Sequence, residues 1–248
     1  MDVPPSAASQ DASPDDDPFY DVYDREQPAY GMTPSAELAA YLRQCHPAGR
    51  ALDLGAGGGR DTLELARAGL QVVAIDRSQR GLDLVMRRAE ASGLAARVTT
   101  QAMDVQDCQL EPNAYRVIVA TTVLDHIPMP ASRRLWQQMV AALQERGAMY
   151  VEVHTSDDPG SSYGAGAQRQ GPVSETASHV INHFPPNRLL QMAIETPGLR
   201  VLRYEERAEW DYTHGPEHLH AKAVLLATKA TLSPDWYGYP AAFTRRGK

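Results

Sequence analysis

Short apolar runs alternate with amphipathic segments along most of the chain. The runs are rich in valine, isoleucine, leucine and alanine, as expected of strands that are buried on both faces of a parallel sheet. The predicted strands are residues 50–55, 71–76, 97–104, 115–123, 148–155, 198–206 and 220–229. The predicted helices repeat apolar residues at helical spacing and are residues 58–69, 79–92, 131–147 and 185–195. This alternation predicts an α/β fold with a doubly wound, mostly parallel sheet.

Two short helical segments are expected before the first strand. The second spans residues 33–46, with Thr33 as its N-cap and Pro34 in its first turn. Its apolar stripe consists of Leu38, Tyr41 and Leu42. The first spans residues 19–32, and its tyrosines either close over a bound ligand or pack on the sheet. These tyrosines are Tyr20, Tyr23 and Tyr30.

A polar segment rich in glycine and serine, residues 156–178, interrupts the alternation. It is long for a structureless loop in a compact domain, and loops of this length tend to be functional lids or disordered segments. We expect a lid-like segment that extends over residues 156–184.

The negative charge is concentrated at the N-terminus. The formal net charge is −7, and residues 1–30 contain eight acidic residues and one arginine, so the remainder carries no net charge. We therefore expect residues 1–17 to be a disordered acidic leader, residues 18–229 to be the folded domain and residues 230–248 to be a tail. A neutral body without a basic stripe argues against nucleic acid as a partner.

Neither a membrane nor an oxidising compartment is indicated. No apolar run approaches the roughly 20 residues of a membrane helix, and no basic region followed by an apolar core marks a secretory signal. Cys45 and Cys108 lie far apart, which suggests neither a disulfide framework nor a zinc knuckle. We expect a cytoplasmic protein, and the sequence indicates no oligomeric state.

Four glycines lie between the first predicted strand and the helix that follows it, in the stretch DLGAGGGRD, residues 53–61. A dinucleotide-binding turn counted from Gly55 requires a third glycine at position 60, which is Arg60. The pattern DxGxGxG fits instead, with Asp53, Gly55, Gly57 and Gly59. In this context the glycines allow a ligand to approach the backbone at the helix N-terminus.

This pattern resembles motif I of class I S-adenosylmethionine (SAM) methyltransferases. The resemblance implies a seven-stranded sheet with an antiparallel last strand, SAM as the cofactor and S-adenosylhomocysteine (SAH) as the product. Asp53 and loop carbonyls would accept hydrogen bonds from the SAM ammonium, and Arg60 either pairs with the SAM carboxylate or is solvated. The expected cofactor-binding residues are Asp53, Gly55, Ala56, Gly57, Arg60, Asp76, Arg77, Asp104, Val105 and Thr121.

Two more acids follow the next predicted strands. Asp76 ends the second strand, where a carboxylate can accept hydrogen bonds from both ribose hydroxyls. Enzymes that use NAD also place an acid there, so Asp76 supports an adenosine cofactor without choosing between the two. By the resemblance, Asp104 accepts from the adenine amino group, and the N–H of Val105 meets a ring nitrogen.

Three stretches resemble the tellurite-resistance methyltransferases within this superfamily. They are GGGRDTLELARAGLQVVAID, VIVATTVLDHIP and THGPEHLHAKAVLLATK. This narrower resemblance implies that the methyl acceptor is a small molecule or a chalcogen oxyanion.

Methyl transfer needs a general base only if the acceptor must lose a proton. Asp125 and His126 follow the fourth predicted strand and are expected near the methyl group. His126 is a candidate base, with helix capping or shielding of the cofactor as the alternative. His154 and Thr155, at the end of the fifth predicted strand, are also expected to face the crevice.

Three histidines near the C-terminus have the spacing H-x3-H-x-H, namely His214, His218 and His220. No metal site is predicted, because zinc sites require convergent neutral imidazoles with supporting hydrogen bonds. The favoured interpretation is that one or two of these histidines face the acceptor and bind or deprotonate it. We name His214 as the second catalytic candidate.

The sequence therefore predicts a SAM-dependent methyltransferase that acts on a small acceptor. A nicotinamide-dependent oxidoreductase is one alternative, although Arg60 argues against it. A SAM-binding protein without catalytic activity is the other, because this chemistry requires no particular catalytic residue.

Overall fold

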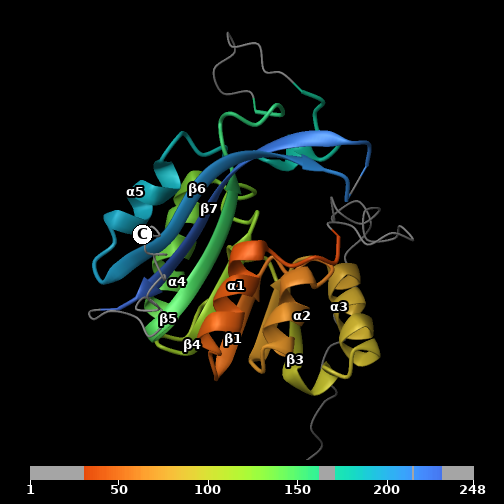
Figure 1. Cartoon of the computed structure of the whole chain (residues 1–248), viewed down its shortest axis with the longest axis vertical. Helices are drawn as coiled ribbons and strands as arrows, with labels where there is room; N and C mark the ends of the chain where they lie inside the picture. Colours follow the sequence, from red (N-terminus) through yellow and green to blue (C-terminus); the bar gives the residue numbers. More distant parts are fainter. Residues whose placement is uncertain (1–30, 162–170, 214, 231–248) are drawn as a thin grey trace, which may run out of the picture.

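A seven-stranded sheet forms the centre of the protein in its computed structural model, which describes residues 31–161, 171–213 and 215–230. The strands are β1 (Arg50–Leu54), β2 (Gln71–Asp76), β3 (Val98–Ala102), β4 (Tyr115–Thr121), β5 (Leu143–His154), β6 (Leu199–Asp211) and β7 (His218–Lys229). Their order across the sheet is β3-β2-β1-β4-β5-β7-β6 (Figure 1). β7 runs antiparallel to both neighbours and the other pairs are parallel, which confirms the predicted fold class.

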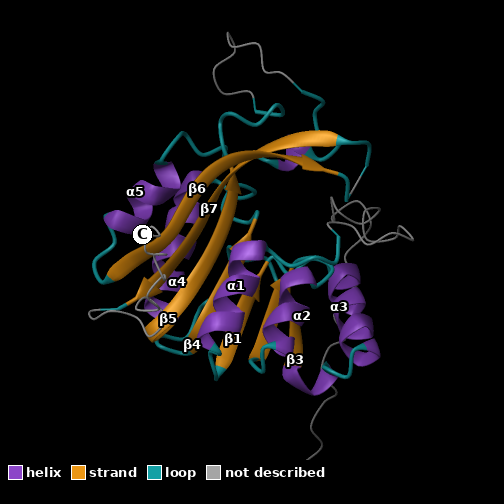
Figure 2. Cartoon of the chain, in the orientation of Figure 1, coloured by secondary structure: helices purple, strands orange, loops and turns teal. Residues whose placement is uncertain are grey.

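Helices cover both faces of the sheet (Figure 2). They are α1 (Ala36–Cys45), α2 (Arg60–Arg67), α3 (Gln79–Ala91), α4 (Met129–Ala142) and α5 (Arg188–Ile194), with short 3-10 turns η3 (Ala95–Arg97) and η4 (Ala177–His179). The apolar sides of α1, α2 and α3 pack on one face of the sheet, and those of α4 and α5 pack on the other. The apolar stripe expected on residues 33–46 is confirmed, since Leu38, Tyr41 and Leu42 are buried.

The pleat of the central strands explains how a polar site arises beside an apolar core. Alternate residues of each strand point to the same face, and on the face of α1, α2 and α3 they are apolar along most of the strand. At the carboxyl edge of the parallel strands, the next positions in this alternation are polar: Asp53, Asp76, Thr121 and Glu152, with His154 following on β5. Antiparallel β7 starts at the same edge, where Lys222 pairs with His154.

Two predicted local details are wrong. The helix predicted over residues 131–147 ends at Ala142, because Leu143 is already extended and pairs with Tyr115 of β4. The register then shifts before Ala148 pairs with Val117, so residues 144–147 form an irregular entry into β5. The N-cap of α1 is Ser35 and not Thr33, and Ser35 uses its hydroxyl in tertiary hydrogen bonds instead of capping the helix.

Several predicted features lie outside the described residues. These are the acidic leader 1–17, the helical segment 19–32 up to Tyr30, His214, and the tail beyond Ala230. The described parts of the lid-like segment contain η4 and an isolated bridge between Thr155 and Phe184. Among the described residues, no helix combines the length and apolar character that crossing a bilayer requires.

Candidate active site

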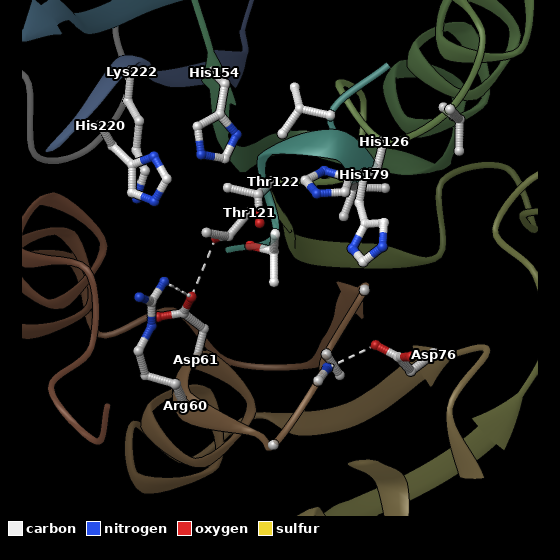
Figure 3. Close-up of a pocket in the computed structure, with 18 of the residues that line it drawn as sticks. Arg60, Asp61, Asp76, Thr121, Thr122, His126, His154, His179, His220 and Lys222 are labelled. Atoms are coloured by element: carbon white, nitrogen blue, oxygen red, sulfur yellow. Dashed lines mark hydrogen bonds and ion pairs between the residues drawn. The ribbon is translucent and has the colours of Figure 1, made fainter. Parts of the chain in front are cut away.

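A cavity of about 580 Å³ opens at the carboxyl edge of the parallel strands. This is the edge at which open α/β sheets bind ligands, and the volume suits a cofactor together with a small substrate. Every predicted cofactor-binding residue lines it, namely Asp53, Gly55, Ala56, Gly57, Arg60, Asp76, Arg77, Asp104, Val105 and Thr121. Figure 3 shows Arg60, Asp61 and Asp76 on one side of the cavity and the histidines on the other.

The glycine loop needs glycine for two separate reasons. Gly55, Gly57 and Gly59 all have positive φ angles, of 66°, 51° and 86°. A Cβ on Gly55 would lie 2.5 Å from Cγ2 of Val123, and one on Gly59 would lie 2.9 Å from Cγ2 of Val85. The loop is therefore packed tightly between neighbouring elements and is not a flexible linker.

Asp76 fixes the shape of this loop. Its Oδ2 accepts the N–H of Gly57 at 2.7 Å, and its Oδ1 accepts the N–H of Ser78 at 2.8 Å. The carboxylate is mostly buried yet lines the cavity, so its remaining lone pairs can accept hydrogen bonds from a ligand. This position is compatible with the ribose-binding role predicted for it.

Asp53 is the most electrostatically unusual of the predicted residues. Burial raises the pKa of Asp53 to about 7, and the nearby Asp61 adds to this shift. Its Oδ2 accepts the hydroxyl of Thr62 at 2.5 Å. A cation placed beside Asp53 would favour its ionised form.

Arg60, in the first turn of α2, belongs to a network of polar side chains. Its Nη2 lies 2.8 Å from Asp61 Oδ2 and donates to the Ser35 hydroxyl at 3.1 Å. Ser35 in turn donates to Glu152 at 2.8 Å, and Tyr150 also donates to Glu152. Although burial alone would raise it, Lys222 and Arg60 hold the pKa of Glu152 below its usual value. This network was not predicted, because it joins Ser35 to Glu152, which are separated by more than a hundred residues in the sequence.

The remaining cofactor candidates sit along the same wall. Asp104 lies two residues beyond the end of β3, which stops at Ala102 and not at Asp104 as the sequence suggested. The N–H of Gln106 donates to Asp104 Oδ1 at 2.8 Å and holds the carboxylate at the rim. Thr121 ends β4 and donates its hydroxyl to Asp61 Oδ2 at 3.2 Å.

Asp125 and His154 form a buried pair at the other end of the cavity. Nδ1 of His154 lies 2.6 Å from Oδ2 of Asp125, and His154 Nε2 has no hydrogen-bond partner within the described part of the chain. Because Asp125 accepts at Nδ1, the lone pair of the neutral ring lies on Nε2. Although burial alone would raise it, His126 and His154 hold the pKa of Asp125 far below its usual value.

His126, the base predicted from the sequence, contacts the same carboxylate. Its Nδ1 lies 3.3 Å from Oδ1 of the same Asp125, and its side chain is 20% exposed. It lines the cavity together with His179, and Figure 3 shows the two on the side away from His220. The structure therefore offers two histidines on one carboxylate, of which His154 is the more buried and the better aligned.

The start of β7 adds further charged groups to this end. Lys222 Nζ lies 3.2 Å from Glu209 Oε1, and His220 Nδ1 lies 3.0 Å from Asp158 Oδ2. His220 and Lys222 line the cavity, whereas His218 is buried behind it. Asp158 comes from the lid-like segment, so that segment contributes directly to the wall.

The site thus has two halves with different chemistry. One half has a glycine loop and acids suited to an amino acid and a nucleoside. The other half has a carboxylate-oriented imidazole beside a group of histidines and a lysine. Such an arrangement can bind a nucleoside cofactor and take a proton from a neighbouring substrate.

Comparisons with known proteins point in the same direction. Residues 51–147 match the family model described as a methyltransferase domain. A ubiquinone biosynthesis O-methyltransferase from Bordetella pertussis is 29% identical over 163 residues, which span 62% of this chain and 66% of that protein. The corresponding protein of Actinobacillus pleuropneumoniae serotype 7 is 35% identical over 106 residues, or 41% of this chain and 44% of that one. The matches therefore span less than two thirds of either relative.

Two solved structures show the likeness in fold. TehB from Haemophilus influenzae superposes with a TM-score of 0.63 at 19% identity and covers 85% of this chain and 65% of that chain. Magnesium protoporphyrin IX methyltransferase from Synechocystis, a structure with bound SAM, has a TM-score of 0.55 at 14% identity. The match covers 78% of this chain and 76% of that chain.

Proposed function

We propose that this chain is a SAM-dependent enzyme that methylates an oxygen atom of a small molecule. Residues 51–147 match the methyltransferase domain model, which supports the proposal. The methyltransferase resemblance predicted from the glycine loop and the three acids is confirmed by the domain match and the fold. Oxygen as the acceptor atom is supported by the pair of His154, which lines the cavity, and Asp125, which is buried behind it.

The residues of the glycine-loop half fit SAM. Asp53 and the loop carbonyls would hold the ammonium of its amino acid part, and Arg60 its carboxylate. Asp76 would accept from the ribose hydroxyls, and Asp104 with the N–H of Val105 would meet the adenine. When bound, SAM supplies a methyl group on a sulfonium, which is already a good leaving group.

At the other half, His154 has the geometry of a general base. Asp125 accepts the Nδ1 hydrogen, which leaves the lone pair on Nε2, a buried atom of a side chain that lines the cavity. The proton of an acceptor hydroxyl would pass to Nε2. Its oxygen would form the new bond to the methyl carbon as the carbon–sulfur bond of SAM breaks, and the electron pair of that bond would stay on the sulfur of SAH. Asp125 stabilises the imidazolium that results, as an oriented carboxylate does in other acid–base pairs.

Of the two acceptor classes predicted, the small molecule is favoured, and we take its acceptor group to be a hydroxyl. A chalcogen oxyanion has already lost its proton, so its methylation would not need the Asp125–His154 pair as a general base. The curated relatives are named as O-methyltransferases, which supports oxygen as the acceptor atom. The likeness to TehB concerns the fold alone at 19% identity.

The experiment is a transfer assay with SAM labelled in its methyl group. Purified full-length protein is offered phenols, catechols, hydroxy acids, thiols, amines, selenite and tellurite in parallel. Label in hydroxyl compounds supports the proposal, and label only in selenite or tellurite replaces it with the oxyanion function. Calorimetry with SAH and with NADH accompanies the assay. Binding of SAH without methyl transfer to any acceptor class would indicate a SAM-binding protein without catalytic activity. Binding of NADH without binding of SAH would indicate an oxidoreductase.

A further inference from the structure

Two histidines at the start of β7 face each other through the same ring atom. Alternation along the strand places His218 and His220 on one face, and their Nε2 atoms lie 3.0 Å apart. Both side chains are almost fully buried, at 1% and 5% exposure. A contact this short between two ring nitrogens needs a hydrogen or a metal ion between them.

The contacts of the other ring nitrogen, Nδ1, show where the hydrogen of each histidine lies. Nδ1 of His218 lies 2.7 Å from the carbonyl oxygen of Pro216, and Nδ1 of His220 lies 3.0 Å from Oδ2 of Asp158. A carbonyl can only accept a hydrogen bond, and Asp158 Oδ2 also accepts the N–H of Ala221. Each Nδ1 must therefore carry the hydrogen.

Two neutral rings therefore supply one hydrogen fewer than their contacts require. The three contacts, at Pro216, between the rings and at Asp158, need three hydrogens, whereas two neutral imidazoles carry two. With both Nδ1 atoms protonated, two lone pairs point at each other across 3.0 Å. Either an extra proton or a metal ion resolves this arrangement.

We propose that a divalent transition metal ion binds to Nε2 of His218 and Nε2 of His220, with the carboxylate of Asp211 as the third protein ligand. Asp211 pairs directly with His218 across β6 and β7, so the strand register places it on the same face. One ligand atom from each of the three residues lies within 4.8 Å of the other two. Two imidazoles and one carboxylate suit ions such as Fe²⁺, Co²⁺ or Zn²⁺.

The geometry around these ligands has the features of metal sites. At a metal–nitrogen distance of about 2.1 Å, nitrogens 3.0 Å apart subtend about 90°, the angle between neighbouring ligands of an octahedron. Metal-binding histidines usually donate their other N–H to a carbonyl or a carboxylate, as both histidines do here. Thr213 fixes Asp211 in a similar way, through hydrogen bonds of 2.6 and 2.7 Å to Oδ1.

This site adjoins the acceptor half of the cavity. His220 and Asp211 line the cavity, and the ring of His154 lies 4.6 Å from the ring of His220, centroid to centroid. A metal ion here would bind an acceptor oxygen and hold it beside His154, a role that rests on the proposed function. The ion-binding claim itself stands on the histidine geometry.

The sequence argued against a metal because a zinc site requires convergent neutral imidazoles with supporting hydrogen bonds, and the motif alone shows neither. His214 lies outside the described residues. Asp211 joins as a ligand, while Asp158 and the carbonyl of Pro216 supply the supporting hydrogen bonds whose absence had counted against a site.

The test is a titration of the full-length protein, stripped with a chelator, with Co²⁺ in the absence of SAM and of any acceptor. We expect saturation at one equivalent with visible d–d absorption, and displacement by Zn²⁺. His218→Asn and Asp211→Asn should each weaken Co²⁺ binding at least tenfold. His46→Asn is the matched control, because His46 is exposed at a left-handed position that asparagine tolerates, and it should bind like the parent.

Circular dichroism and SAH affinity establish that each variant is folded. Asp211 is half-buried, so Asp211→Asn decides the question if His218→Asn does not fold. The site would be overturned if Co²⁺ binding did not saturate, or if both folded variants bound Co²⁺ as tightly as the parent. A proton shared between the two rings would then explain their contact. Since no methyl transfer is measured, this result is independent of the proposed function.

Discussion

One oxygen of Asp125 holds both the backbone and the ring of His154. Oδ2 accepts the backbone N–H of His154 at 2.9 Å and contacts its Nδ1 at 2.6 Å. Asp125 comes from the turn after β4 and His154 from the end of the adjacent β5, and Asp125 has no exposed surface. The ring is therefore fixed in position and tautomer before any substrate arrives.

The first prediction concerns this ring. If His154 is the general base, His154→Gln should lower kcat by about 10²–10⁴-fold, the usual contribution of acid–base catalysis. SAH affinity should stay unchanged, because His154 is on the acceptor side of the cavity. The measurement is steady-state methyl transfer to the hydroxyl acceptor identified by the labelled-SAM assay, together with SAH calorimetry.

His126→Gln is the matched control, since His126 contacts the same carboxylate through its other oxygen. It should reduce kcat by much less than His154→Gln. The reverse order would return the role of base to His126, as the sequence predicted. If both variants were as active as the parent, the reaction would not use either histidine as a general base.

Much of this site could be predicted because it follows from local patterns. Asp53, Asp76 and the glycines belong to strand ends and turns whose spacing can be read directly, and they all line one cavity. His154 was expected to face the crevice for the same reason, since it ends a strand. Its pairing with Asp125 was not foreseen, because that contact depends on β4 and β5 being neighbours.

The acceptor half was harder to predict because distant segments build it. Asp211 and His218 face each other only through the register of β6 with β7, and Asp158 arrives from the lid-like segment. The sequence placed the end of one of these strands at residue 206 and the start of the other at residue 220. The structure extends both toward the site, to Asp211 and from His218. Strand ends are decided by pairing across the sheet, which composition does not reveal.

The second prediction concerns cofactor affinity. Asp76→Ala should weaken SAH binding by about 1.5–3 kcal/mol, because it removes hydrogen bonds to a charged acceptor. It also releases the N–H of Gly57, which Asp76 holds at 2.7 Å. Asp107→Ala changes an exposed acid beyond the same edge of the sheet and should bind SAH like the parent. Calorimetry with both variants checks this, and unchanged affinity in Asp76→Ala would refute its ribose role.

The third prediction is a pH dependence of cofactor binding. Burial raises the pKa of Asp53 to about 7, with Asp61 adding to the shift, so the carboxyl is largely protonated at pH 6 and ionised at pH 8. The SAH ammonium favours the ionised form, and below pH 7 binding must first remove the proton. SAH affinity should therefore fall with decreasing pH, by up to about tenfold per unit below pH 7.

Asp53→Asn separates this effect from other titrations in the cavity. The variant should bind SAH more weakly at pH 8 and should lose most of the slope between pH 6 and pH 8. Calorimetry in buffers of different ionisation enthalpy would also detect release of a proton on binding to the parent near pH 6. A parent affinity that is flat across this range would mean that Asp53 does not face the ammonium.

The last prediction concerns the packing of the glycine loop and uses two glycines with similar backbones. Gly59 and Gly69 have φ angles of 86° and 97°, so alanine at either position meets the left-handed penalty of roughly 1–2 kcal/mol. A Cβ at Gly69 has no neighbour within 4 Å, whereas one at Gly59 lies 2.9 Å from Val85 Cγ2. Gly59→Ala should therefore lower the free energy of unfolding by about 1–3 kcal/mol more than Gly69→Ala, since it also overpacks the interface of loop and helix. Urea denaturation of the two variants measures the difference. Equal losses would mean that α3 can move away from the loop, and that the glycine at this position serves the backbone alone.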